Sequence, residues 1–565
     1  MKRSIQETNQ QHKKIKLDDN HYFNSSSFVN YMLDIPIFDY LEMYNYEKDS
    51  DAFNENIRIQ SNLNYNYRII SLKRKCIDMN YYFDDLTDYN NHESVDLTKK
   101  MIKENVQVIF NGCLRCDKMR LFSHFDVLIH SSIICDFLDV DLTSHSHSQS
   151  QSQSQSQSQS QSFVGYYQLL IVYNNNRDQK KNNVILYGKQ KVLDSHFSNN
   201  STPTFDSTFT QPQTFILSNT NTIYTIDLNK QQLFYKMNEA YKWIHDLREN
   251  GRSWDLFNPT RHELLPNMKH GSTYGYKRII QSIISKNDEL TSYNDITLEK
   301  RNDYFMRKMI IEDALKESGK QFLKSVIELR GTNKIKCDLS KIIVPKKRVF
   351  YVDFEYINSF HFKRDFSIPD TNHLYLIGVL YEKDGSWLYK AFVPVAIDHM
   401  NPSSSYEVQN IRDWVDFMES FGAPYCVMNW STAEQSMLSS LSKQYHFELE
   451  TTIEWIDLLK LFKSTIHFVC DGMKTYSLKD VAKSMYKLGH IKTSWNDNVM
   501  NGLEANILLI PKFIKGDYVL TSCDSLSDII DYNEIDCRVM MELFEFVVSI
   551  KQNKNNHVLI YGSYK

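Results

Sequence analysis

The stretch KKRVFYVDFEYI, residues 346–357, contains the pattern that decides the fold of the second half of this chain. A run of apolar side chains is interrupted by Asp353 and Glu355, which are two positions apart. Side chains two apart on a β-strand point to the same face, so the pattern predicts a strand with both carboxylates on one face. Two such acids are costly to bury unless a cation lies between them, and a divalent metal ion is the usual cation. The alternative is an edge strand with both acids in water. The neighbouring Phe350 and Val352 argue against this alternative, because their apolar side chains indicate a buried strand.

Further strands and helices are expected after this stretch. The runs LYLIGVLYE (374–382), YKAFVPVAI (389–397) and PYCVMNW (424–430) have the composition of strands, and helical patterns follow them up to the final run 527–550. Strands followed by helices predict an α/β fold with a sheet of mixed direction.

More polar residues extend the acidic pattern. Tyr532 and Asp536 are four positions apart in the final helix and therefore share one face. Asn429 ends a predicted strand, and Glu434 follows it in a predicted helix. With Asp353 and the acid two positions after it, this order resembles the motifs of the DnaQ-like, or DEDD, 3′–5′ exonucleases of the ribonuclease H fold, in the variant whose last motif carries tyrosine. Glu434 stands where that family usually has Asp, and its longer side chain could still reach the ions.

A wider resemblance covers about 200 residues. Predicted RecB-family nucleases with a C-terminal ribonuclease H-like domain share the runs WIDLLKLFK (455–463), YSLKDVAKSMY (476–486), NGLEA (501–505) and YNEIDC (532–537). The resemblance implies a metal-dependent nuclease, a 3′–5′ exonuclease whose substrate is DNA in preference to RNA. Its catalytic domain would be a ribonuclease H-like domain at residues 341–552.

The resemblance also implies a site chemistry. Two Mg²⁺ or Mn²⁺ ions about 3.5–4 Å apart would bridge the scissile phosphate, one activating water and the other stabilising the leaving 3′-oxygen. Their ligands would be Asp353, Glu355, Glu434 and Asp536, and such a set of oxygen ligands suits Mg²⁺. Tyr532 would orient or deprotonate the attacking water. Two neighbours keep open roles: Asp457 as a residue that orients the ligands or as a helix N-cap, and Lys479 as a phosphate contact or part of a solvated helix face.

The region at residues 21–260 resembles a PD-(D/E)XK nuclease domain that has lost its motif. Asp126 lies in the middle of a predicted antiparallel strand, where that family has its first metal ligand, but the next strand, YYQLLIVY (166–173), has no acid and no Lys. A literal D-x-K at 178–180 lies in a polar stretch that predicts a loop. We therefore expect a degenerate domain that binds DNA or serves as a scaffold. The same region predicts a Ser-capped helix over 25–44 and a strand over 182–188.

The remaining segments are connecting or polar. Residues 1–20 are polar with two basic clusters and predict a disordered tail. Residues 144–162, SHSHSQSQSQSQSQSQSQS, have no apolar side chain to bury and predict a flexible loop. Residues 261–340 predict a helical connector between the two domains.

Composition limits the class of protein. The 565 residues carry a net charge of −4, so nucleic-acid binding would need a local basic surface. No run of about 20 apolar residues and no secretory signal is found, and the nine cysteines fit reduced thiols. An intracellular soluble protein without a membrane partner is expected, with nucleus, cytoplasm and viral factory left open. The abundance of Tyr and Phe and the polar repeat are reminiscent of giant DNA viruses or AT-rich protists.

Two rival functions stay open. In one, both nuclease folds have decayed, and the chain is a nucleic-acid-binding or scaffold protein. In the other, the same fold cuts RNA or nicks structured DNA internally, because the pocket contacts that read the sugar are not visible in any motif. No protein partner is indicated.

Overall fold

The computed structural model describes residues 22–48, 52–140, 165–172, 179–197, 213–218, 222–228, 234–270, 275–358, 372–394, 406–449, 451–495, 526–552 and 559–560. These residues form two compact units. The first takes its residues from Met1–Asp49, Arg58–Pro266 and Ser272–Arg278, and the second from Ser50–Ile57, Asn267–Gly271 and Ile279–Lys565. Both units combine helices with mixed sheets, so the predicted α/β class is confirmed. Among the described helices, none is both long enough and apolar enough to cross a membrane.

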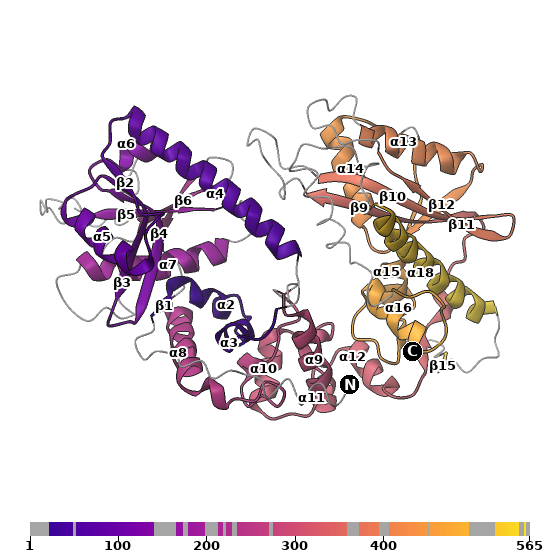
Figure 1. Ribbon diagram of the computed structural model, residues 1–565. Coiled ribbons are helices and arrows are strands. Elements are labelled where there is room, and N and C mark those ends of the chain that lie inside the picture. Colours follow the sequence, from indigo (N-terminus) through magenta and orange to yellow (C-terminus); the bar gives the residue numbers. More distant parts are fainter. Residues whose placement is uncertain are drawn as a thin grey trace, which may run out of the picture. The chain divides into compact units, whose positions relative to one another are not determined.

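The first unit is built on a mixed sheet (Figure 1). Its described strands follow the order β2-β3-β4-β5-β6-β7, with β1 paired to β4. They are β1 (Phe23–Asn24), β2 (Phe83–Asp85), β3 (Val108–Cys116), β4 (Leu121–His130), β5 (Tyr166–Ile171), β6 (Gln213–Leu217) and β7 (Ile223–Asp227). β4 carries Asp126 and is antiparallel to both β3 and β5, as predicted.

Helices pack against this sheet. They include α4 (Ala52–Asp78), of which residues 58–78 belong to this unit, α5 (Asn91–Lys103), α6 (Ile134–Leu138) and α7 (Gln179–Phe197). A further helix of the unit, α8 (Phe234–Asn250), contacts the helical segments between Ser25 and Met43. Ile69 and Cys76 of α4 share one apolar core with Phe110 of β3 and Val127 of β4. On β5, the side chain of Gln168 donates a hydrogen bond to the carbonyl of Leu186 in α7.

The predicted strand over 182–188 is wrong, because these residues belong to α7. Residues 183, 184 and 186–194 of this helix are all buried. A helix buried nearly all round has no polar face, and its short apolar run cannot be told from a buried strand by periodicity.

The single helix predicted over 25–44 is instead broken. A 3₁₀ turn (Ser25–Phe28) and α2 (Val29–Met32) are followed by α3 (Ile37–Met43). Asp34 adopts φ 65°, in the left-handed region, and Pro36 disfavours helical backbone at the residue before it. The chain therefore starts a new helix after the break.

The second unit contains a five-stranded sheet in the order β11-β10-β9-β12-β13. The strands are β9 (Arg348–Asn358), β10 (Asn372–Lys383), β11 (Ser386–Phe392), β12 (Tyr425–Asn429) and β13 (Trp455–Asp457). β10 is antiparallel to β9 and β11, whereas β12 is parallel to β9 and β13. The predicted strand that carries the D-x-E pattern is thus the central strand of a mixed sheet.

Alternation along β9 separates two cores. Phe350 and Val352 point into a core with Trp414 of α13 (Tyr406–Glu419), whereas Tyr351 points into another core with Val539 of α18 (Leu526–Gln552). Figure 1 shows α18 on one side of β9 and β10, with α13 and α14 (Ala433–Tyr445) on the other. Asp353 and Glu355 have the parity of Tyr351, so they face α18.

Shorter elements complete the unit. They are α9 (Lys277–Asn287), of which residues 279–287 belong to this unit, α10 (Leu298–Met306), α11 (Ile311–Glu317), α12 (Gln321–Leu329), α15 (Leu458–Lys460), a π-helix (Leu461–Thr465) and α16 (Leu478–Lys487). A small sheet joins β8 (Ile335–Cys337) to β14 (Val469–Cys470) and β15 (Leu559–Ile560). The helical stretch predicted between residues 261 and 340 is largely helical, and from residue 279 it belongs to the second unit.

Candidate metal centre

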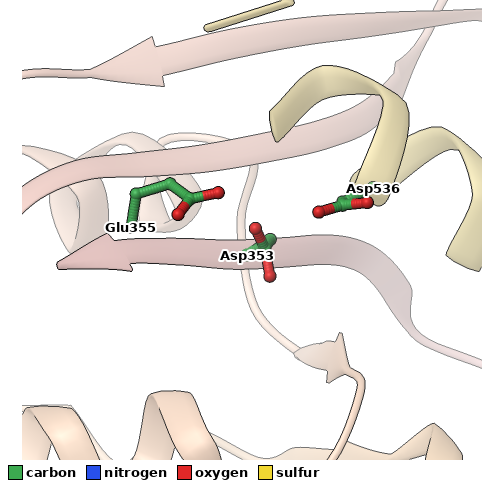
Figure 2. Close-up of side chains that lie close together, drawn as sticks. All are labelled: Asp353, Glu355 and Asp536. Carbon is green, nitrogen blue, oxygen red and sulfur yellow. The ribbon is translucent and has the colours of Figure 1, made fainter. Parts of the chain in front are cut away.

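Three carboxylates meet where α18 crosses β9. One oxygen from each of Asp353, Glu355 and Asp536 lies within 4.8 Å of the others, and this is the sole such group of three or more metal-ligating side chains in the described residues. Figure 2 shows Asp353 and Glu355 on the strand and Asp536 reaching toward them from the helix. Glu355 and Asp536 are buried, and Asp353 is half-buried. The structure thus brings together three of the five predicted site residues at one point.

Asn533 holds Asp353 from the same helix. It is fully buried, and its Nδ2 donates a hydrogen bond of 2.8 Å to Oδ2 of Asp353. Its Oδ1 accepts a hydrogen bond of 2.9 Å from the hydroxyl of Tyr389 on β11. Gly378 on β10 leaves room for this amide, because a Cβ at that position would lie 1.6 Å from Oδ1 of Asn533. Asn533 was not among the residues predicted from the sequence, although a glycine inside a predicted strand, here Gly378, indicates a close approach.

Asp536 has two hydrogen-bonding neighbours. The indole Nε1 of Trp495 donates to its Oδ1 at 2.9 Å, and the hydroxyl of Tyr532 also hydrogen-bonds to it. Tyr532 is buried, one helical turn before Asp536. Burial and the carboxylates of Asp536, Glu355 and Asp353 raise the pKa of Tyr532 well above its ordinary value.

Lys479 brings a positive charge to the centre. Its ammonium lies 4.8 Å from the ring centroid of Tyr532 and 5.7 Å from that of Trp495. It belongs to α16, whose N-terminus is capped by the Ser477 side chain. Its charge lowers the pKa values of Asp353, Glu355 and Asp536, against the larger effect of burial. Two roles were open for Lys479, a phosphate contact or part of a solvated helix face. Its place beside Tyr532 and Trp495 does not fit a solvated helix face.

Glu434 lies outside the group of three. It is buried in the first turn of α14, and its Oε2 accepts a hydrogen bond of 2.6 Å from Nδ2 of Asn429. Its charge nevertheless raises the pKa values of Asp353 and Glu355, so it lies close to the centre. The predicted pair of Asn429 and Glu434 is therefore an actual contact, and a role for Glu434 as a metal ligand stays a prediction.

Asp457 is a helix N-cap. Its Oδ1 accepts from the backbone N–H of Lys460 at 2.9 Å, at the start of α15. The same oxygen accepts from the N–H of Ser431 at 3.2 Å. Because Ser431 is in the turn between β12 and α14, Asp457 also fixes the turn that precedes Glu434.

Burial makes the charged forms of the carboxylates in and near the centre costly. Burial and nearby carboxylates raise the pKa of Glu355 to about 8 and that of Asp353 well above its usual range. Burial raises the pKa of Glu434 to about 7 and that of Asp536 to about 6. Several buried carboxylates at neutral pH are stable only if protonated or bound to a cation. Their oxygens form the ligand set that Mg²⁺ and Mn²⁺ prefer, so these residues fit a divalent ion.

In the first unit, the neighbours of Asp126 differ from those of the carboxylates in the second unit. Asp126 lies in the middle of β4, and its Oδ1 is 3.2 Å from the Nζ of Lys189 on α7. Its Oδ2 accepts a hydrogen bond from the N–H of Ile171 at 2.7 Å. Gln168 of β5 donates to the side chain of Gln190 at 2.8 Å. In the described residues, Asp126 thus has a lysine rather than a cluster of acids beside it, and Asp178 of the literal D-x-K lies outside those residues.

Comparison of the chain with family models, curated proteins and solved structures finds no match. The functional assignment therefore depends on the geometry of the centre and on the motifs in the sequence.

Proposed function

We propose that this protein is a metal-dependent nuclease, a 3′–5′ exonuclease on DNA, with its chemistry in the second unit. The observation that carries the proposal is the convergence of Asp353, Glu355 and Asp536 within 4.8 Å. Their order in the sequence, with Tyr532 one turn before the last acid, also matches the motifs of the ribonuclease H-like exonucleases. The mixed sheet with the D-x-E strand in its centre supports a ribonuclease H-like fold.

Mg²⁺ or Mn²⁺ would be held by Asp353, Glu355 and Asp536, and Glu434 would join them if its side chain turned away from Asn429. When bound, such ions lower the pKa of water and stabilise charge on the phosphate and the leaving oxygen. The hydrogen bond from Asn533 would hold the Asp353 carboxylate in the orientation that binding needs.

Two other side chains would act on the substrate. The hydroxyl of Tyr532, which is hydrogen-bonded to Asp536, would orient or deprotonate the attacking water. The ammonium of Lys479, 4.8 Å from that ring, would face an oxygen of the scissile phosphate. A fixed positive charge aimed at developing negative charge is among the strongest contributions to catalysis.

The substrate panel is the direct test. End-labelled single- and double-stranded DNA and RNA are incubated with the full-length protein in Mg²⁺, Mn²⁺ or EDTA. The proposal expects 3′-end shortening of DNA that needs a metal and is lost in Asp353→Asn. No metal-dependent cleavage of any substrate would exclude the enzyme, and internal or RNA cleavage would change the substrate class.

The rival function, a nucleic-acid-binding protein with a decayed site, has one observation in its favour. Glu434 is hydrogen-bonded to Asn429 rather than grouped with the other acids. Calorimetric titration with Mn²⁺ separates the two functions, because an intact centre binds ions whether or not the correct substrate has been found. Binding that vanishes in Asp353→Ala would argue against the decayed site.

A further inference from the structure

The antiparallel pair of β9 and β10 is irregular beside the metal centre. Leu374 of β10 pairs with Tyr356 of β9, but Leu376 pairs with Glu355, so one step along β9 corresponds to two steps along β10. Tyr375 is the extra residue of this β-bulge. Bulges are frequent next to active sites, where they change the direction of a side chain.

The bulge directs Tyr375 to the face of the sheet that carries the metal centre. Leu374 packs in the core that contains Trp414 of α13, so the next side chain points to the opposite face, where Asp353 and Glu355 lie. Tyr375 is fully buried there. Burial, and then the carboxylates of Glu355 and Asp353, raise the pKa of its hydroxyl well above the ordinary value, which agrees with a position close to them.

The hydroxyl of Tyr375 is buried without a hydrogen-bond partner in the described part of the chain. Buried hydroxyls are nearly always hydrogen-bonded, because an unpaired one has lost its bonds to water and gained none. A buried group left unpaired needs an explanation, and a role at a functional site is one. Since phenylalanine would fill the same space without this cost, the hydroxyl itself is the feature to explain.

Glu355 is the acceptor that faces this hydroxyl across the strand pair. Side chains opposite each other on one face of an antiparallel pair have Cβ atoms about 4.5–5.5 Å apart, and rotation about the side-chain bonds of Glu355 can bring a carboxylate oxygen to the hydroxyl. Only the ionised carboxylate binds a cation. In a buried site an ionised carboxylate needs hydrogen-bond donors, and the hydroxyl of Tyr375 can serve as one.

We propose that Tyr375 is a positioning residue of the metal centre, whose hydroxyl donates a hydrogen bond to the Glu355 carboxylate when that carboxylate binds a divalent ion. The inference rests on the metal centre of the proposed nuclease and adds to it a residue from β10, a strand that supplies none of the grouped carboxylates. Hydrogen-bonded neighbours of metal ligands orient them, and their loss typically lowers metal affinity about 10–100-fold. The hydroxyl therefore costs stability while it is unpaired and contributes affinity once the ion is bound.

Two measurements on Tyr375→Phe test the proposal, and neither needs a substrate. Calorimetric titration of the full-length protein with Mn²⁺ gives the metal affinity, and thermal unfolding in EDTA gives the stability of the metal-free protein. We expect the Mn²⁺ affinity to fall about tenfold or more. The melting temperature in EDTA should stay the same or rise, because phenylalanine keeps the ring and removes an unpaired buried hydroxyl. A merely structural role would lower the melting temperature instead.

Tyr351→Phe is the matched control. Tyr351 of β9 also has a fully buried side chain, with a hydroxyl that has no hydrogen-bond partner among the described residues. Burial raises its pKa, with smaller contributions from Glu545 and Cys426, which lie outside the centre. We expect Tyr351→Phe to leave the Mn²⁺ affinity unchanged and, like Tyr375→Phe, not to lower the melting temperature in EDTA.

A double-mutant cycle tests whether Tyr375 acts through Glu355. Glu355→Asp keeps a carboxylate but shortens the side chain by one methylene, so its oxygens no longer match the position of the Tyr375 hydroxyl. Tyr375→Phe should therefore lower the Mn²⁺ affinity by a smaller factor in Glu355→Asp than in the unaltered protein. Equal factors in the two backgrounds would place the effect on another residue and contradict the proposal.

Three further results would overturn the proposal. They are an unchanged Mn²⁺ affinity in Tyr375→Phe, an equal loss of affinity in Tyr351→Phe, and a loss in Tyr375→Phe that is accompanied by a lower melting temperature in EDTA. The nuclease is judged separately, because a protein that binds Mn²⁺ but cuts no substrate would lose the proposed function and still decide the role of Tyr375. If the unaltered protein binds no Mn²⁺, both proposals fail.

Discussion

Asn533 donates a hydrogen bond of 2.8 Å to the carboxylate of Asp353, although the two residues are 180 positions apart in the chain. A second, longer contact of 3.3 Å joins the same Nδ2 to the carbonyl oxygen of Asp353. These contacts connect the C-terminal helix α18 to the central strand β9. The position of Asp536 over Asp353 and Glu355 therefore depends on the position of the Asn533 side-chain amide.

Gly378→Ala should displace the side-chain amide of Asn533. The added Cβ would lie 1.6 Å from Oδ1 of Asn533 and 2.7 Å from the hydroxyl of Tyr389, so the amide must move. Overpacking of this kind costs about 1–3 kcal/mol of unfolding free energy, and we expect metal-dependent cleavage to fall with it. In a double-mutant cycle, Asn533→Ala should make Gly378→Ala less costly. Purely additive effects in urea unfolding would show that the two residues do not interact.

Tyr532→Phe should keep the ring packing and the affinity for Mn²⁺ but lose the hydroxyl that we propose acts on the attacking water. Turnover should fall by about 10²–10⁴-fold, the usual scale for a positioned acid–base group. Asp536→Asn should lose metal binding as well. Tyr486→Phe, at an exposed tyrosine of α16, is the control and should be fully active. Full activity of Tyr532→Phe with unchanged metal dependence would remove Tyr532 from the site.

Lys479→Met keeps an unbranched side chain of similar length but removes the ammonium that lies over the Tyr532 ring. We expect turnover to fall by about 10²–10³-fold, as when a charge-stabilising donor is removed, and Lys479→Arg to recover part of it. Lys483→Met removes an exposed lysine from the same helix and should have no effect. Equal losses in Lys479→Met and Lys479→Arg would contradict a role for the charge.

The stability of the metal-free protein should fall as pH rises from about 5 to about 8. Burial raises the pKa of Glu355 from 4.5 to about 8 and that of Glu434 from 4.5 to about 7. The folded protein therefore holds protons that the unfolded chain releases, so the stabilisation present below pH 4.5 is lost as pH passes the raised values. Thermal unfolding in EDTA measures this slope, and saturating Mn²⁺ should flatten it. Glu355→Gln should show a weaker slope, and an identical slope would assign the pH dependence to other groups.

Deleting residues 144–162 should leave the melting temperature almost unchanged. This Ser/Gln repeat lies outside the described residues, and the prediction comes from its lack of apolar side chains together with the slow dependence of loop closure on length. A large drop in melting temperature would show that the repeat contributes to the fold.

Local patterns predicted the elements that carry the centre. The D-x-E strand is β9 and the final helix is α18, because period-2 and period-3.6 spacing assign faces directly. The meeting of Asp536 with Asp353 and Glu355 was expected from the family resemblance and not from spacing. The run at 182–188 was assigned wrongly, because α7 is buried nearly all round and has no amphipathic period.

Contacts between distant segments could not be predicted in this way. Asn533 and Trp495 reach the centre from different segments, and nothing in their own neighbourhoods distinguishes them from ordinary polar or aromatic residues. Lys479 was singled out by its motif, but spacing could not decide between its two alternatives. Glu434 could be predicted as a site residue because it follows Asn429 in a short motif. Its contact with Asn429 rather than with the other acids depends on side-chain orientation. Orientation is set by packing, which spacing along the chain does not specify.

The separation between β9 and α18 has a consequence for how the protein is made. With 180 residues between Asp353 and Asn533, a ribosome needs about 10–40 s to reach the helix after it has produced the strand. During that interval, the nascent chain has two of the three grouped carboxylates and lacks the helix that supplies the third. A chain interrupted by a premature stop in this interval would be released without Asp536, so only translation through α18 produces the complete group of three carboxylates.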